Sequence, residues 1–373
     1  MHNMRREVII LSLIAYFLFL GAGSSQTFVI PHLNTMFPGI QSSLVLATVY
    51  LSIILGVLLN IPLKQKYLKN KLILGVTGYV TFPFSIFLTR EYVLLIASSI
   101  YFGITVAFFW IQIFYIVLNV SDEKEFGTNS GIVFLGSGLG TFFGTILLGL
   151  VQKTYGYDFV FLTAALLSML GFLPTYLLAP SGGKSPERVR LKDLLVISGS
   201  KIVTFLYFFG YFGYGTALNS VSCAVSSILG PPMIGPVLSG FFLVSALLSV
   251  YSGKLSDTLG RRKTFIIAFS LGAFGLFLNS VLPNLVTLMV LCILLGFQTS
   301  AVPVNALGWI GERTRKSGRL SSICSSLVWD SAAVTTSILS SSVIYEFLGS
   351  YQSVFFSFGV FSLFCSILSY FLK

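Results

Sequence analysis

Long apolar stretches alternate with short polar connectors along the whole chain. Each of twelve stretches holds about 17 to 28 residues, the length that an α-helix needs to cross the hydrocarbon core of a bilayer. A helix pairs nearly all of its backbone polar groups internally, as a bilayer requires, so each stretch predicts a membrane-spanning helix. The stretches run over 8–30, 42–63, 72–88, 92–119, 127–151, 159–178, 198–222, 235–252, 264–282, 285–310, 318–345 and 351–371. The pattern predicts an all-α integral membrane protein with twelve transmembrane helices.

Basic residues gather in alternate connectors, which sets the orientation. With twelve spans, both termini and all even-numbered connections lie on one side of the membrane. Every Lys and Arg except Arg90 and Lys153 falls on that side or just inside a span next to it. Because positive residues concentrate on the cytoplasmic side, we expect a multi-pass protein of the cell (plasma) membrane with both termini cytoplasmic.

The composition agrees with this class and excludes several others. Of the 373 residues, 55% are hydrophobic and 9% are charged, against roughly 25% charged in soluble domains. The net charge of +11 lies in connectors, so it indicates orientation and not a nucleic-acid surface. The four cysteines and two histidines form no metal, disulfide or catalytic motif. We therefore expect no enzyme activity, no cofactor, no metal and no nucleic-acid partner.

The longest connector, Ala179 to Ile197, divides the chain in two. It contains two prolines, two glycines and four basic residues, which is typical of a linker. Residues 103–127 also resemble residues 296–318, which indicates an internal repeat. We expect an N-terminal six-helix bundle at 1–179, a cytoplasmic linker at 180–197 and a C-terminal six-helix bundle at 198–373.

The connector between the eighth and ninth stretches carries the most specific motif. Residues 253–263 read G-K-L-S-D-T-L-G-R-R-K. With two six-span halves and a basic central loop, the chain resembles the major facilitator superfamily over its whole length. The resemblance implies two pseudo-symmetric bundles that act as a rocker-switch secondary transporter. Its cavity would be lined chiefly by spans 1, 4, 7 and 10, flanked by 2, 5, 8 and 11. The motif residues to which the resemblance gives a gating role are Gly253, Asp257, Gly260, Arg261 and Arg262.

The first-half counterpart of this motif has decayed. Residues 61–71 have Gln65 where the motif has its acid. The resemblance puts the motif acid against the boundary between the halves when the cytoplasmic side is closed. By pseudo-symmetry, Asp257 should meet the helix N–H groups at 126–129, and the acidic connector 122–125 should pair with the motif's basic residues. We therefore expect a one-sided latch.

Asp330 is the only acidic residue near the middle of a span. A charge at that depth costs at least about 2.5 to 3.5 kcal/mol, and such residues usually have a function. Asp330 could carry the coupled proton or serve as counter-ion to a cationic substrate. The structural alternative is an acid that is hydrogen-bonded near Ser326, Trp329 or Ser331.

Polar side chains recur at helical spacing in several spans, which favours a shared aqueous cavity. Span 7 also carries tyrosines, which bind sugars, amides or organic cations. The alternatives are polar contacts between packed helices and, for the tyrosines, an interfacial belt. Trp110 is a weaker candidate because it lies off the span 4 stripe. The expected cavity residues are Gln26 in span 1, Thr105, Phe108, Gln112 and Tyr115 in span 4, Tyr207, Tyr211 and Tyr214 in span 7, and Gln298 and Asn305 in span 10.

Glycines at 136, 140 and 144 form a repeated G-x-x-x-G ridge in span 5. Such ridges allow helices to approach closely. We expect this ridge to pack against a span of the other half.

These features together predict a transporter that works by alternating access. No Arg or Lys lies at mid-depth, so the substrate is expected to be a small neutral or monocationic organic solute, moved with protons through Asp330. The expected partners are that solute, protons and the lipid bilayer, and the expected state is a monomer. Two alternatives stay open: a facilitative uniporter in which Asp330 is structural, and a transporter-like receptor or scaffold.

Overall fold

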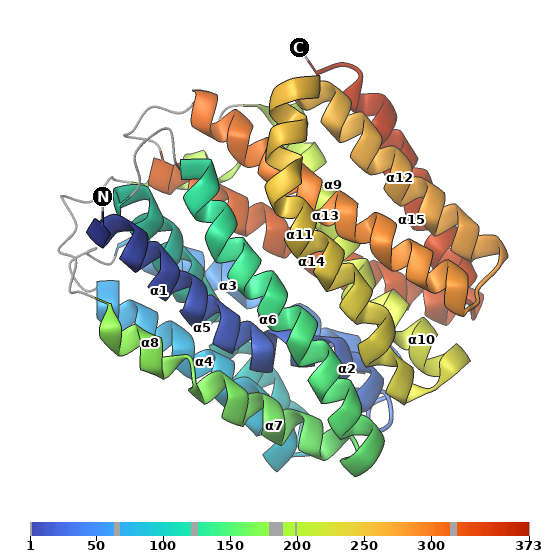
Figure 1. Cartoon of the computed structure of the whole chain (residues 1–373). Coiled ribbons are helices and arrows are strands. Elements are labelled where there is room, and N and C mark those ends of the chain that lie inside the picture. Colours follow the sequence, from blue (N-terminus) through green and yellow to red (C-terminus); the bar gives the residue numbers. More distant parts are fainter. Residues whose placement is uncertain are drawn as a thin grey trace.

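A computed structural model describes residues 2–62, 68–120, 126–178, 189–197, 200–313 and 319–372. Over these ranges the chain is helical, with short turns and no strand. Both ends of the chain lie toward the same end of the bundle (Figure 1), as an even number of spans requires. We call this the terminal end and the other the opposite end.

Six spans form the first half. The first is one bent helix of three segments, and the sixth is interrupted after Met169. The elements are α1 (His2–Leu18), the π-helical η1 (Phe19–Gly23), α2 (Ser24–Leu33), α3 (Ile40–Asn60), α4 (Leu68–Leu88), α5 (Tyr92–Val120), α6 (Phe126–Tyr155), α7 (Tyr157–Met169) and α8 (Phe172–Leu177).

The second half repeats this plan. Its first span is again one helix with a central π-helical segment, as in the first half. The elements are η3 (Leu191–Leu194) before the half, then α9 (Lys201–Thr216), η5 (Ala217–Val221), α10 (Ser222–Leu229), η6 (Pro231–Met233), α11 (Ile234–Leu259), α12 (Arg261–Val281), α13 (Leu285–Arg313), α14 (Arg319–Leu348) and α15 (Tyr351–Ser369).

Eleven spans in the described part of the chain are long and apolar enough to cross a membrane. The twelfth, α9 with η5 and α10, covers 201–229 and is less apolar because tyrosines, glycines and Asn219 interrupt it. The prediction of twelve transmembrane helices in two six-helix bundles is confirmed by this architecture and by the family match reported below.

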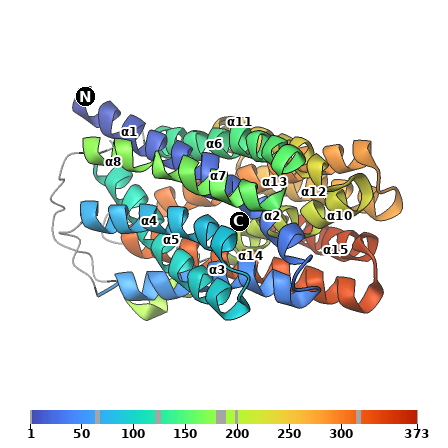
Figure 2. The ribbon, with the colours of Figure 1, turned by 90° about the horizontal axis from the view of Figure 1, so that it is seen from below.

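Two helix pairs join the halves: α6 lies along α11, and α3 along α14. Figures 1 and 2 both show α6 beside α11 at the boundary. Gly149 and Gly235 allow the first pair to touch: a Cβ built on Gly149 would lie 3.0 Å from the Cα of Gly235. The two backbones are therefore in direct contact across the boundary.

The prediction that the glycine ridge packs against a span of the other half was wrong. Gly136, Gly140 and Gly144 do not face the other half; they lie against Ser12, Tyr16 and Leu20 of the first span. The reason is geometric, since residues 138 and 149 occupy the side of α6 that meets α11. The ridge therefore holds the first half together.

Hydrogen bonds close the boundary at the opposite end. Ser43 Oγ in α3 lies 2.6 Å from Ser342 Oγ in α14. The backbone N–H of Ile40 donates to Glu346 Oε1 at 2.6 Å. Because Ile40 is the first residue of α3, a carboxylate of one half caps a helix N-terminus of the other.

The motif connector is shorter than its polar composition indicates. Helix α11 continues to Leu259 and α12 begins at Arg261, so Gly260 alone makes the turn. Gly260 has a φ of 85°, a conformation that glycine adopts without steric cost. Both helices therefore extend past the apolar stretches into polar sequence, where backbone hydrogen bonds continue them.

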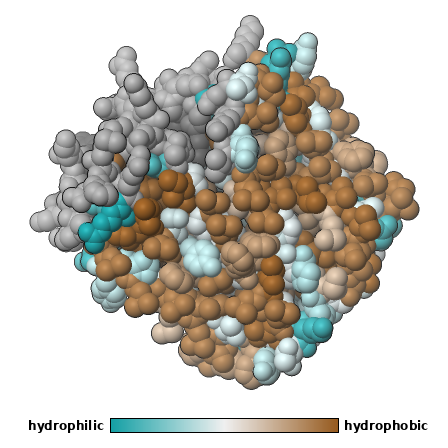
Figure 3. Space-filling model, viewed as in Figure 1, coloured by the Kyte–Doolittle hydropathy of each residue, from teal (hydrophilic) through white to brown (hydrophobic). Residues whose placement is uncertain are grey.

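The outer surface is apolar. Figure 3 shows hydrophobic residues across most of the described part of this face, with hydrophilic ones mainly at its edges. Large apolar side chains such as Leu150, Phe274 and Phe347 are exposed. An apolar surface this extensive is stable in lipid and not in water.

Candidate functional site

A cavity of about 230 Å³ lies between the two halves. Spans 1 to 5 of the first half and spans 7, 8, 10 and 11 of the second half contribute to it. Most of its lining is aromatic or aliphatic, and it includes the rings of Phe19, Trp110, Phe114, Phe134 and Phe242. Polar groups project into this apolar enclosure at a few points, an arrangement typical of small-molecule sites.

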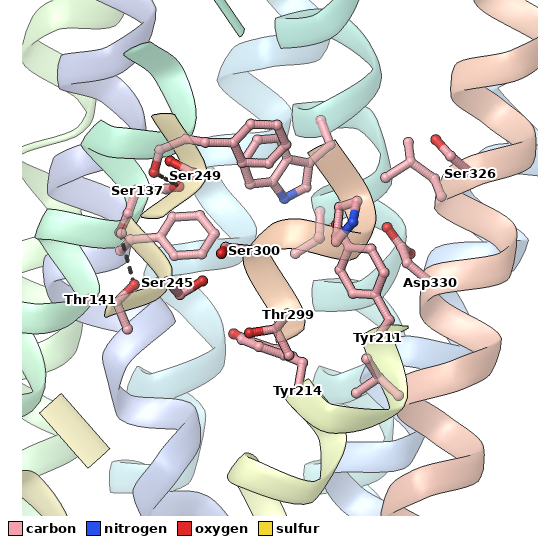
Figure 4. A pocket seen from close by; sticks show the side chains of 18 of the residues that line it. Ser137, Thr141, Tyr211, Tyr214, Ser245, Ser249, Thr299, Ser300, Ser326 and Asp330 are labelled. Carbon is pink, nitrogen blue, oxygen red and sulfur yellow. Dashed lines mark hydrogen bonds between the residues drawn. The ribbon is translucent and has the colours of Figure 1, made fainter. Parts of the chain in front are cut away.

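Asp330 lines the cavity from α14. It is half-buried, and Ser331 Oγ donates a hydrogen bond of 2.9 Å to its Oδ1. Figure 4 shows the carboxyl group beside the ring of Tyr211, directed into the open space. Of the other proposed structural partners, Ser326 Oγ donates to the carbonyl of Ile323, and the indole N–H of Trp329 donates to the carbonyl of Leu194. The acid therefore keeps a free face toward the cavity.

The tyrosines of α9 form one wall of the cavity. Tyr207, Tyr211 and Tyr214 all line it, and the rings of Tyr207 and Tyr211 lie 5.1 Å apart. The three residues are spaced by four and three, so helix α9 turns them all the same way. On the facing half, Tyr50 donates a hydrogen bond of 2.5 Å to Gln26 Oε1, and both residues line the cavity.

Serine and threonine hydroxyls cover the side facing Asp330. Figure 4 shows Ser137 and Thr141 of α6, Ser245 and Ser249 of α11 and Ser300 of α13 across the cavity from the acid. None of these residues was predicted from the sequence. Serines and threonines are common along every span, so nothing in their spacing distinguishes them.

The predicted stripe of α5 lies away from the cavity. Thr105 donates to carbonyls of its own helix and packs against Gly78 of α4. Gln112 is fully buried, and neither Oε1 nor Nε2 has a hydrogen-bond partner. Phe108 is buried and Tyr115 half-buried, and neither is among the described lining residues. In this conformation the stripe packs within the first half.

The cavity-facing side of α5 is apolar. It carries Phe102, Val106, Trp110 and Phe114, each four residues after the last. Trp110, the weaker candidate, thus lines the cavity in place of the polar stripe. A pattern of polar residues could not have identified this face, because it has no polar group apart from the indole N–H of Trp110.

The polar residues predicted in span 10 also lie away from the cavity. Gln298 is buried against Gly272 of α12 and accepts a hydrogen bond from Ser362 Oγ at 3.3 Å. Gln298 packs against Gly272 as Thr105 packs against Gly78, so the two halves repeat each other in helix packing as well as in sequence. The side of α13 that lines the cavity carries Thr299 and Ser300.

Asn305 belongs to the motif region and not to the cavity lining. Its Oδ1 accepts from Ser256 Oγ at 2.5 Å, and its Nδ2 donates to the carbonyl of Arg261 at 2.7 Å. Arg261 Nη1 in turn donates to Ser256 Oγ at 2.8 Å. This network ties the turn at Gly260 to α13.

The rest of the gating motif is described in part. The guanidinium of Arg262 lies 3.9 Å from the ring centre of Tyr370, the residue that follows α15, a cation–π contact. Gly253 and Asp257 lie within α11, but the side chain of Asp257 and the acidic connector 121–125 lie outside the described part of the structure. The expected latch between them stays a prediction.

A mostly apolar cavity between two six-helix membrane bundles is the arrangement of a membrane transporter. The comparisons with known proteins agree. A family model described as Major Facilitator Superfamily matches residues 12–204 and, as a second segment, 202–373. The chain therefore belongs to the major facilitator superfamily, and family and fold point to a transporter of a small molecule and not to an enzyme.

A structural neighbour supports the fold. The chain is similar to a solved bacterial homologue of the human drug peptide transporters PepT1 and PepT2, with a TM-score of 0.73 over 98% of this chain and 97% of that chain. The two sequences are 13% identical, so the likeness shows the fold alone. No curated protein matches the sequence.

Proposed function

We propose that the protein is a secondary active transporter of a small neutral or monocationic organic solute, coupled to protons through Asp330. The observation that carries the proposal is the position of Asp330, a half-buried acid in a mostly apolar cavity between the halves. A carboxyl group there can be protonated and neutral, or ionised and paired with a cation. Burial makes the free-energy difference between these two states large.

The lining supports the solute class. Among the described lining residues there is no Lys, Arg or His, so an anionic group would meet no counter-charge. Aromatic rings and hydroxyls offer stacking and hydrogen bonds to an uncharged or singly positive molecule. The binding residues we propose are Gln26, Tyr207, Tyr211 and Tyr214, together with Trp110.

Rocker-switch alternating access is the proposed mechanism. The opposite end is closed by the bonds of Ser43 to Ser342 and of Ile40 to Glu346, which join the two halves. Breaking them while the terminal end closes would expose the cavity to the other side of the membrane. The halves would then move about the α3–α14 and α6–α11 contacts.

Orientation and organisation complete the proposal. We infer a monomer in the plasma membrane with the terminal end cytoplasmic, because the basic connectors lie there. We also infer two functional units, 1–179 and 198–373, joined by the linker 180–197.

Transport into liposomes tests the proposal. The purified chain is first screened for stabilisation by sugars, amines, amino acids and drugs, since a bound solute raises the unfolding temperature. Uptake of a stabilising solute should respond to a pH gradient in the natural chain. Asp330→Asn should retain solute exchange but lose the response to the gradient. An unchanged gradient response in this variant would refute proton coupling through Asp330, and absence of stabilisation and flux for every solute would refute transport.

A further inference from the structure

Most of the serine and threonine hydroxyls that line the cavity can only accept a hydrogen bond from a solute. A hydroxyl group has one proton to donate and two lone pairs that accept. Six cavity hydroxyls already donate their proton to a carbonyl of their own helix. These are Ser137 (2.9 Å), Thr141 (2.8 Å), Ser249 (2.7 Å), Thr299 (2.9 Å), Ser300 (3.0 Å) and Ser326 (2.9 Å). Each therefore presents only lone pairs to a solute.

Two groups of acceptors face each other across the cavity. Asp330 stands on one side, next to Tyr211 (Figure 4). On the other stand Ser137, Thr141 and Ser300, which we call the hydroxyl wall. These three come from α6 and α13, so both halves of the protein contribute to the wall. A solute that fills the space meets a carboxylate at one end and hydroxyl lone pairs at the other.

Aromatic rings line the same cavity. Trp110 stacks on Phe114 with ring centres 5.3 Å apart and on Phe134 at 5.8 Å, and Phe19 meets it edge-on at 5.7 Å. All four residues line the cavity. The volume of about 230 Å³ lies below the roughly 300–1,000 Å³ of sites for drug-sized ligands, which favours one ring with a short chain.

We propose that the transported solute is a small aromatic amine with a hydrogen-bond donor at the end remote from the amine. Its ammonium group pairs with Asp330, its ring lies among the aromatic side chains, and its remote O–H or N–H donates to the hydroxyl wall. This inference rests on the proposed function and names its substrate class. It also excludes zwitterions: no described lining residue carries a positive charge for the carboxylate of an amino acid or a short peptide.

Four probes that share one ring separate the parts of this proposal. The first is 2-(4-hydroxyphenyl)ethylamine, which has both the ammonium and the donor. The second lacks the hydroxyl, and the third carries a methoxy group, which accepts but cannot donate. The fourth is 3-(4-hydroxyphenyl)propionate, which has an anion in place of the ammonium. Binding to the purified full chain is measured by calorimetry.

The hydroxylated amine should bind about fivefold more tightly than the other two amines, the effect of one hydrogen bond. The propionate should show no measurable binding. Equal affinity of the three amines would overturn the role of the hydroxyl wall. Binding of the propionate at the affinity of the amine would overturn the role of the ammonium group.

Variants assign each end of the solute to its site. Thr141→Val keeps the side-chain shape and, combined with Ser137→Ala and Ser300→Ala, should abolish the preference for the hydroxylated amine over its methoxy analogue. Asp330→Asn should abolish the preference for the amine over the propionate. Glu91→Gln is the matched control, since Glu91 is exposed and is not a lining residue, and it should change neither preference. Unchanged preferences in both cavity variants would overturn the assignment.

This test can fail separately from the proposed function. Gradient-driven uptake of a solute that is not an amine would leave the transporter proposal standing and refute the substrate class. The comparison of the four probes in the natural chain can refute the inference by itself. The inference can therefore be refuted even if a variant fails to fold.

Discussion

The contact between Gly149 and Gly235 offers a way to change the balance between conformations. A Cβ on Gly235 would lie 2.7 Å from the carbonyl oxygen of Thr145 and 2.9 Å from the Cα of Gly149. Both are backbone atoms and cannot rotate away. Gly235→Ala should therefore force α6 and α11 apart at the opposite end, where the halves are closed.

The size of the effect follows from the cost of overpacking. An added methyl group in a tight contact costs about 1 to 3 kcal/mol. A conformation in which the opposite end is open relieves this strain, so the ratio of open to closed molecules should rise about 5- to 150-fold. The change also raises helix propensity, by about 1 kcal/mol, but that gain is equal in both conformations.

Cys223 reports the change directly. It lies in α10 at the opposite end, is 4% exposed, and its Sγ is 3.9 Å from Asn34 Nδ2 of the other half. With the other three cysteines replaced by serine, maleimide labelling of Cys223 measures how often this end opens. Labelling should accelerate in Gly235→Ala.

Gly240→Ala is the matched control for this experiment. Gly240 lies in the same helix, but a Cβ there would meet no atom within 4 Å apart from the nearby backbone of its own helix. The control therefore adds the same methyl group and the same helix propensity without the clash. Equal labelling rates in the two variants would refute the argument that the α6–α11 contact holds this end closed.

Three further changes test other contacts. Glu346→Gln removes the charge that caps α3 through Ile40 and should raise Cys223 labelling about fivefold, from a loss of about 1 kcal/mol; an unchanged rate would contradict the role of this cap. Asp257→Ala should favour the conformation closed at the opposite end and lower the same labelling rate, and no shift would contradict the latch. Asn305→Ala removes two hydrogen bonds of the side-chain amide, one from Ser256 and one to the Arg261 carbonyl, and should cost about 1 to 3 kcal/mol, seen as a lower unfolding temperature; an unchanged temperature would contradict the network.

The spans could be predicted because lipid imposes one simple requirement. A helix must be apolar over about 20 residues, and this is visible in hydropathy alone. Helix ends were less accurate: α11 continues seven residues past the predicted end at residue 252, because helical hydrogen bonding does not stop where apolar residues do. Asp330 could be found because a mid-span acid is rare and costly.

The faces of the helices could be predicted only in part. A stripe such as Thr105 and Gln112 shows that one side of a helix is distinct, but not whether that side meets a cavity or a neighbouring helix. The glycines against which Thr105 and Gln298 pack, Gly78 and Gly272, lie in other spans, so only the folded chain relates them. The cavity face of α5 is apolar, so its hydropathy does not distinguish it from the lipid-facing side of the same helix.

Proton movement driven by the solute tests the central claim most directly. Liposomes that contain the protein and a pH-sensitive dye receive a gradient of the stabilising solute, with no pH gradient imposed. If Asp330 couples the two fluxes, the solute gradient should change the internal pH in the natural chain and leave it unchanged in Asp330→Asn. Solute flux without any proton movement in the natural chain would contradict the account.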